Sequence, residues 1–205
     1  MLEVRKYEGK TKEEAMQSCI EELNIEETNL YTRYQETEAK LFKSKKVTLE
    51  VVTKEDVTNY LKEFINEYAK GMNIDIHSEI KEKDGIYNVV LVSEEHNPIL
   101  IGKDGRTLTA LQTLLRSSIQ AKTGFTIKVV VDVANYKAKK QKNLEFEARK
   151  IAREVLKTKV EAKLDPMNSY DRRVVHEVVS KFENLETESF GEAPNRYVVI
   201  RYKKD

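Results

Sequence analysis

Two glycines flank Lys103 and Asp104 in the segment NPILIGKDGRTLTALQ, residues 97–112. Because glycine lacks a Cβ, such a GxxG loop lets another backbone approach closely. A helix that begins directly behind the loop points its N–H groups and the positive end of its dipole at an anion. Leucines spaced by three and four residues predict that helix. The pattern therefore predicts a phosphate-binding loop, and an ordinary tight turn between packed helices is the alternative. The loop consists of Ile101, Gly102, Lys103, Asp104, Gly105 and Arg106.

A second grouping lies near the C-terminus, where Arg172 and His176 are four residues apart in the segment DRRVVHEVV. Residues with this spacing lie on the same side of a helix, here beside an apolar stripe of valines, so a guanidinium and an imidazole can converge on one anion or base plane. Arg173 adds a second guanidinium next to them. The alternative is that His176 only forms a hydrogen bond with a neighbouring turn.

The net charge of +1 conceals an uneven distribution along the chain. Residues 1–56 contain 10 basic and 13 acidic side chains, residues 57–134 contain 9 and 10, and residues 135–205 contain 17 and 12. The basic surplus includes a tract dense enough to form a positive patch near a phosphate backbone, although a solvated helix face is an equally good interpretation. The tract consists of Lys137, Lys139, Lys140 and Lys142.

The sequence contains no grouping that predicts catalysis. Its three histidines are far apart, and one cysteine gives no metal-ligand spacing of the usual kinds. The segment GKDGRT holds its glycines too close together for a P-loop, and neither GxSxG nor HExxH occurs. We therefore expect a binding protein that is not an enzyme and has no metal, no cofactor and no catalytic residue.

The pattern of apolar residues predicts an α+β chain of three small α/β-layer domains, at residues 1–54, 55–134 and 135–205. The first is a β-α-β-β unit with a capping box at Thr11 and Glu14. The second consists of a helix, two strands joined by a turn at Lys83-Asp84-Gly85, a short helix, the GxxG loop, a helix and a strand. The third begins with a long helix that joins it to the second, followed by a strand, the helix with Arg172 and His176, and two strands. These elements are expected at residues 2–9, 11–23, 29–35, 46–52, 55–70, 74–81, 86–93, 126–133, 135–157, 160–164, 168–182, 186–190 and 196–202.

Residues 55–134 resemble a type II KH domain in their order of elements, and NPILIGKDGRTLTALQ looks like its signature segment. Residues 135–205 resemble an R-three-H domain, named for its Arg-x-x-x-His motif. Together with the opening Gly-Lys-Thr-x-Glu-Glu-Ala, Gly9 to Ala15, they resemble the Jag family over the whole chain, which is also called the KhpB or SpoIIIJ-associated family. The chain departs from that family at Asp104, where a basic or polar residue is usual, and at residues 40–46, KLFKSKK, where relatives carry a glycine-rich turn.

The resemblance implies a regulatory protein that binds single-stranded RNA, or single-stranded DNA, with the GxxG loop clamping about four nucleotides. It also implies a role in cell-envelope growth or division, a small single-KH protein or a second copy as partner, and an association with a membrane-insertion system. The absence of a long apolar run predicts a cytoplasmic protein without a transmembrane segment. The alternative is a protein-interaction adaptor whose KH-like and RxxxH parts only hold shape. The acidic segment 1–54 is expected to dock a protein rather than RNA.

Overall fold

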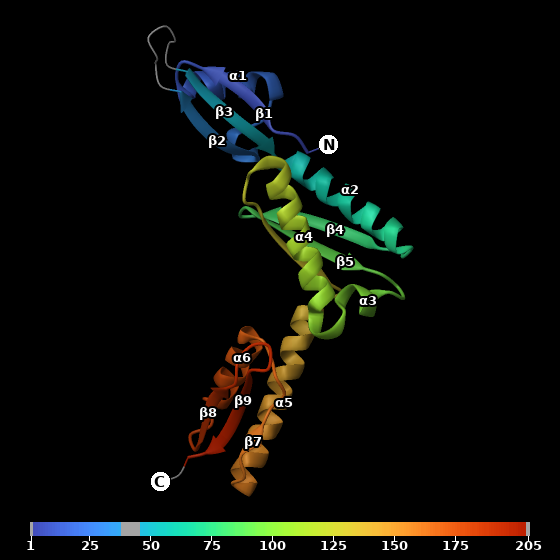
Figure 1. Ribbon diagram of the computed structural model, residues 1–205, viewed down its shortest axis with the longest axis vertical. Coiled ribbons are helices and arrows are strands. Elements are labelled where there is room, and N and C mark those ends of the chain that lie inside the picture. Colours follow the sequence, from blue (N-terminus) through green and yellow to red (C-terminus); the bar gives the residue numbers. More distant parts are fainter. Residues whose placement is uncertain (1, 38–45, 204–205) are drawn as a thin grey trace. The chain divides into compact units, whose positions relative to one another are not determined.

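The computed structural model describes residues 2–37 and 46–203 (Figure 1). The chain divides into two compact units, residues 1–134 and 135–205. The first unit contains two three-stranded sheets and the second contains one, each covered by helices, which confirms the predicted α+β class. The boundary expected after residue 54 lies inside the first unit, and the three-domain division stays a prediction. Residues 40–45, where the sequence departs from the glycine-rich turn of its relatives, lie outside the described residues.

The N-terminal sheet forms the predicted β-α-β-β arrangement, with the strand order β1-β3-β2 and antiparallel pairing throughout. Thr11 caps α1 by accepting a hydrogen bond from the Glu14 N–H, and the Glu14 carboxylate accepts one from the Lys10 N–H. The buried face of α1, which includes Cys19, packs on the sheet. Its elements are β1 (Arg5–Gly9), α1 (Lys12–Leu23), a 3-10 turn (Glu27–Asn29), β2 (Leu30–Thr37) and β3 (Lys46–Thr53).

The rest of the first unit has the order of elements expected for a type II KH domain. Its sheet order is β4-β5-β6, with β4 and β5 antiparallel and β5 and β6 parallel. Asp84 and Gly85 both have positive φ, as a two-residue hairpin turn between twisted strands requires. The elements are α2 (Lys54–Met72), β4 (His77–Lys83), β5 (Ile86–Val92), α3 (Asn97–Ile101), the 3-10 turn η2 (Lys103–Gly105), α4 (Arg106–Thr123) and β6 (Lys128–Val133).

In the second unit, α5 and α6 pack together against an antiparallel sheet of order β7-β9-β8. Asn168 caps α6 by accepting a hydrogen bond from the Asp171 N–H, as its sequence predicts. The core between the layers is built mostly from alanine and valine. The elements are α5 (Tyr136–Thr158), β7 (Ala162–Lys163), α6 (Ser169–Val179), β8 (Leu185–Phe190) and β9 (Tyr197–Tyr202).

The strand expected at residues 160–164 is much shorter in the structure. Only Ala162 and Lys163 pair with β9, opposite Ile200 and Val199, while Val160 is 66% exposed. The antiparallel register would place Val160 opposite Tyr202, the last residue of β9. The pairing nevertheless does not extend to Val160, so the alternation of apolar residues predicts a longer strand than the one that forms.

Candidate nucleic-acid interface

The GxxG loop turns sharply between α3 and α4. Gly102, Asp104 and Gly105 have φ values of 69°, 57° and 84°. A Cβ built on Gly102 would lie 2.1 Å from the Thr107 Oγ1 atom and 3.0 Å from the Thr107 backbone nitrogen. Only glycine fits at position 102, because both its φ and the contact with Thr107 exclude a side chain.

The middle of the loop and the start of α4 are open to solvent. Lys103, Asp104 and Arg106 are exposed, Ile101 is half-buried, and Gly105 is buried. Within the described residues, no side chain caps the N-terminus of α4, and its first turn contains no acidic residue. The Gly105 and Arg106 N–H groups donate to the Gly102 and Lys103 carbonyls within the loop. The positive end of the dipole of this 18-residue helix, with the N–H groups of its next residues, points toward whatever occupies the loop.

An exposed apolar side chain precedes the loop on α3. Ile99 is 50% exposed. The segment PILI contains only apolar residues, so its sequence does not show which of them faces solvent. The neighbouring Leu100 is fully buried. Sequence reasoning missed Ile99 as a candidate contact for a base, because a five-residue helix is too short for its period to show which side is buried.

Arg172 and His176 lie on the same side of α6, as their spacing predicts, and both contact the hydroxyl of Ser189 on β8. The Arg172 Nη1 atom donates to the Ser189 Oγ at 3.1 Å, and the His176 Nε2 atom lies 3.0 Å from the same oxygen. The His176 Nδ1 atom lies 2.7 Å from the Thr187 Oγ1. Both side chains are half-buried, whereas Arg173 is exposed. The pair therefore fixes the strand beside the helix, and its hydrogen bonds differ from the neighbouring-turn contact considered as the alternative.

Burial, and then the positive charge of Arg172, lower the pKa of His176 below its ordinary value of about 6.5. His176 is therefore neutral at pH 7 and contributes hydrogen bonds rather than charge. The positive charge of the motif resides on Arg172 and Arg173.

Acidification is expected to destabilise the second unit through His176. In the unfolded chain this residue takes up a proton near pH 6.5, and in the folded unit only at a lower pH, so its stabilising contribution is present above about pH 6.5 and is lost as the pH falls. Thermal melts about one pH unit above and below that value measure the effect. The variant His176→Gln should show a smaller pH dependence, whereas His77→Gln, at an exposed position of β4, should match the wild type. An identical pH dependence in wild type and His176→Gln would contradict this.

The four lysines of the basic tract do not form one patch. The Lys140 Nζ donates to the Asp171 Oδ2 at 2.7 Å, and the Asn168 side chain donates to the same oxygen at 2.9 Å. Lys140 thus connects α5 to the start of α6. Lys139 and Lys142 are exposed three residues apart on one face of α5, and Lys137 is exposed in the first turn.

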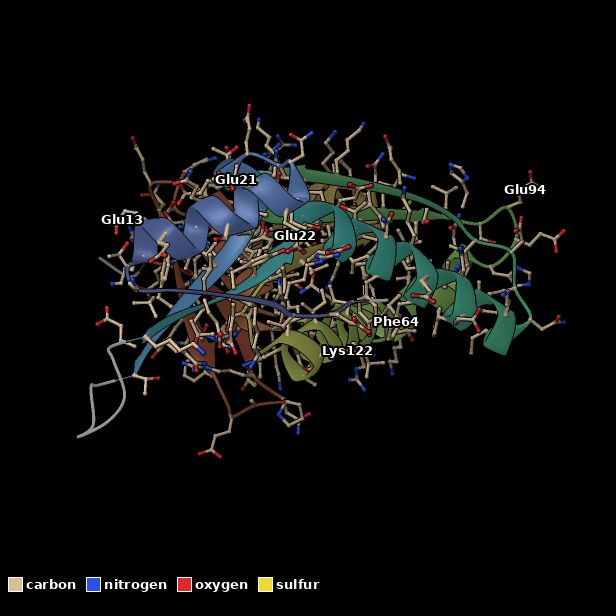
Figure 2. The ribbon with its side chains drawn as sticks, turned by 90° about the horizontal axis from the view of Figure 1, so that it is seen from above. Glu13, Glu21, Glu22, Phe64, Glu94 and Lys122 are labelled. Atoms are coloured by element: carbon tan, nitrogen blue, oxygen red, sulfur yellow. The ribbon has the colours of Figure 1, made fainter. Side chains whose placement is uncertain are left out.

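The N-terminal sheet has a different surface chemistry. Helix α1 carries exposed glutamates, of which Glu13, Glu21 and Glu22 are labelled in Figure 2. The buried carboxylate of Glu50 pairs with Arg33 and Lys6, and Arg33 followed by Lys6 hold the pKa of Glu50 below its ordinary range. Among residues 2–37 and 46–54, most of the cations are paired with a carboxylate, including Arg5, Lys6, Lys12, Arg33 and Lys46.

Arg33 also connects this sheet to the KH part of the same unit. Its Nη1 atom donates to the Gly124 carbonyl at 3.0 Å, and its guanidinium lies 5.0 Å from the centre of the Phe125 ring. A second contact between the same two parts is the ion pair of Arg5 with Asp56, which lies at the start of α2. These contacts pack the N-terminal sheet against the KH part within the first unit.

The fold and both motifs define a protein that combines a type II KH domain with an R-three-H domain. The KH domain of the KhpA/KhpB type matches residues 54–133, and the R-three-H domain matches residues 142–202. RNA-binding protein KhpB of Clostridium symbiosum is 33% identical over 202 residues, which cover 96% of this chain and 90% of that protein. RNA-binding protein KhpB of Bacillus subtilis (strain 168) is 31% identical over 204 residues, covering 96% and 97%. The chain belongs to the KhpB family, also called Jag, which confirms the resemblance seen in its sequence.

Residues 2–37 and 46–203 include no helix that is both long enough and apolar enough to cross a membrane. In the same ranges, no group of three or more His, Cys, Asp or Glu side chains is placed to hold a metal ion.

Proposed function

We propose that this protein binds single-stranded RNA and that the GxxG loop clamps the phosphate backbone. The observation that carries the proposal is the start of α4, where an 18-residue helix begins without a side-chain cap behind two glycines of positive φ. Backbone N–H groups in that position suit phosphate oxygens, which bear negative charge in any RNA sequence. The names of the relatives, which describe RNA-binding proteins, support the same ligand.

The residues of the loop take distinct roles in this proposal. Gly102 and Gly105 give the loop its turn of positive φ, and the exposed Lys103 and Arg106 supply positive charge to the RNA backbone. Ile101 positions the loop from its half-buried place at the end of α3. Asp104 opposes binding, because its carboxylate is exposed within the same loop.

The second unit is proposed to add contacts of its own. Arg172 and the exposed Arg173 supply positive charge at the RxxxH helix, and neutral His176 holds Arg172 in place through their shared partner Ser189. Lys139 and Lys142 on α5 are proposed to contact phosphates, together with Lys137. Lys140 has a structural role through its ion pair with Asp171. It would contribute only to the electrostatic potential at the RNA and would not contact a phosphate.

An adaptor function is the second candidate, and the acidic surface of α1 favours it for segment 1–54. A basic protein segment is the kind of partner such a surface attracts. Three further assignments rest on the family alone and stay proposals. They are a small single-KH protein or a second copy as partner, association with a membrane-insertion system, and a role in cell-envelope growth or division. Cytoplasmic location, expected from the lack of a long apolar run, is a proposal as well.

The proposal is tested by a salt titration of the wild type and Asp104→Lys against a mixed pool of short single-stranded RNA. The repulsion between the exposed Asp104 carboxylate and a phosphate is worth roughly 1 kcal/mol, so replacing it by lysine should tighten binding at least about fivefold. If the new lysine neutralises one phosphate, the slope of log K against log salt should steepen by about 0.7.

Asp84→Lys makes the same charge change at another exposed loop residue of positive φ and serves as the control. Fluorescence anisotropy measures all three proteins. Lack of binding by the wild type at low salt would refute RNA as the ligand. Binding that Asp104→Lys does not change would place the RNA away from the loop.

A further inference from the structure

Helix α5 has an outer face that the motifs do not explain. Ala148, Ala152 and Val155 are buried against the rest of the second unit. Six residues on the opposite side follow one another at spacings of three or four, and all six are exposed. This α5 face consists of Lys139, Lys142, Phe146, Lys150, Arg153 and Lys157.

A phenylalanine stands in the middle of these five cations. Phe146 is 70% exposed, more than any other large apolar side chain among the described residues. Lys142 and Lys150 are each four residues away, so they flank the ring along the helix. A single exposed apolar side chain is common on protein surfaces, so the feature that distinguishes this ring is its place between two lysines.

Carboxylates border the α5 face but are not among its six residues. Glu147 lies three residues before Lys150, and Glu154 lies four residues after Lys150 and three before Lys157, so both exposed glutamates flank the C-terminal half of the face. Glu145 is engaged by Arg149, whose Nη2 lies 3.2 Å from the Glu145 Oε2. From Lys139 to Lys157 the α5 face extends about 27 Å, at 1.5 Å per residue, and its N-terminal half, with Lys139 and Lys142, has the fewest carboxylate neighbours.

We propose that the α5 face is a further binding surface for single-stranded RNA. Its lysines and Arg153 neutralise successive phosphates, and an unpaired base stacks on Phe146, which is the combination of positive track and aromatic platform used for single strands. This inference rests on the proposed RNA-binding function. An anionic membrane is the weaker candidate, since a helix that lies in a lipid interface needs a broad apolar face and this one presents a single ring.

The absence of tryptophan from the chain permits a direct test of stacking. Phe146→Trp introduces the only indole, and stacking of a base on it should quench its fluorescence when a single-stranded RNA of about 16 nucleotides is added. Phe64→Trp, which replaces a half-buried ring on α2 (Figure 2), is the control and should not be quenched. Equal quenching in both variants, or in neither, would overturn the proposal.

Two further variants measure the contribution of the α5 face to affinity for the same RNA. Phe146→Ala should weaken binding about tenfold, as expected for one stacked base. A triple variant, Lys142→Gln with Lys150→Gln and Arg153→Gln, should reduce the salt slope by about 2 if each residue contacts a phosphate. The charge-matched control replaces three exposed lysines of the first unit, Lys10, Lys12 and Lys62, by glutamine and should leave the slope unchanged.

The outcomes separate this inference from the proposed function. RNA binding by the wild type that neither Phe146→Ala nor the triple variant changes would overturn the α5 face and leave the GxxG loop standing. A wild type that does not bind RNA would remove both. A blue shift of Phe146→Trp fluorescence on vesicles of phosphatidylglycerol, without quenching by RNA, would assign the face to a membrane and overturn the proposal.

Discussion

Replacing Gly102 and Gly105 together by aspartate should weaken binding to single-stranded RNA by at least about 100-fold, because two charge-assisted hydrogen bonds from backbone N–H groups are lost at roughly 1.5 kcal/mol each. Two new carboxylates near phosphate add repulsion. The sequence predicts an exposed loop whose fold survives this change, but the structure corrects that expectation in part. Gly105 is buried, and a side chain at Gly102 would collide with Thr107.

The loop is therefore expected to move and the unit to lose roughly 1–2 kcal/mol per substituted position of positive φ, while the helix core behind it stays folded. Gly71→Asp with Gly85→Asp is the matched control, since neither site has an atom within 4 Å of an added Cβ and Gly85 also has positive φ. Anisotropy gives the affinity and circular dichroism the melt. Near wild-type affinity in the loop variant would identify the GxxG segment as an ordinary turn.

Val178→Asp should unfold the second unit while the first unit keeps its own melting transition. Val178 is 3% exposed in the core shared by α5, α6 and the sheet. The substitution forfeits roughly 1.5–3 kcal/mol of apolar burial and adds several kcal/mol for an unpaired buried carboxylate. That sum approaches the whole stability of a small folded unit, which is roughly 5 kcal/mol at the lower end.

Arg173→Asp places the same carboxylate on the exposed side of the same helix and should leave the melt unchanged. Hydrogen exchange monitored by mass spectrometry reports the two units separately. Val178→Asp should retain the RNA affinity of the loop and lose that of α5 and the RxxxH helix. Unaltered affinity would show that the second unit does not contact RNA, and simultaneous loss of protection in both units would show that they fold as one.

Local elements of this protein follow from its amino-acid order without further information. The capping box at Thr11, the spacing of leucines behind Gly105 and the Asp84-Gly85 turn act over a few residues, and each formed where its pattern predicts. The spacing of Arg172 and His176 brings both side chains to one side of a helix, because four residues make about one turn. The order of these elements was sufficient to identify the family.

Contacts between elements became visible only in the folded chain. Ser189 lies 13 residues beyond His176 and holds both members of the RxxxH pair, and Asp171 removes Lys140 from a basic patch that its neighbours suggest. Val160 follows the alternation of a strand and is nevertheless exposed, because β7 begins only at Ala162. Such contacts depend on which element packs opposite a residue, and periodicity along the chain carries information about the residue's own element only.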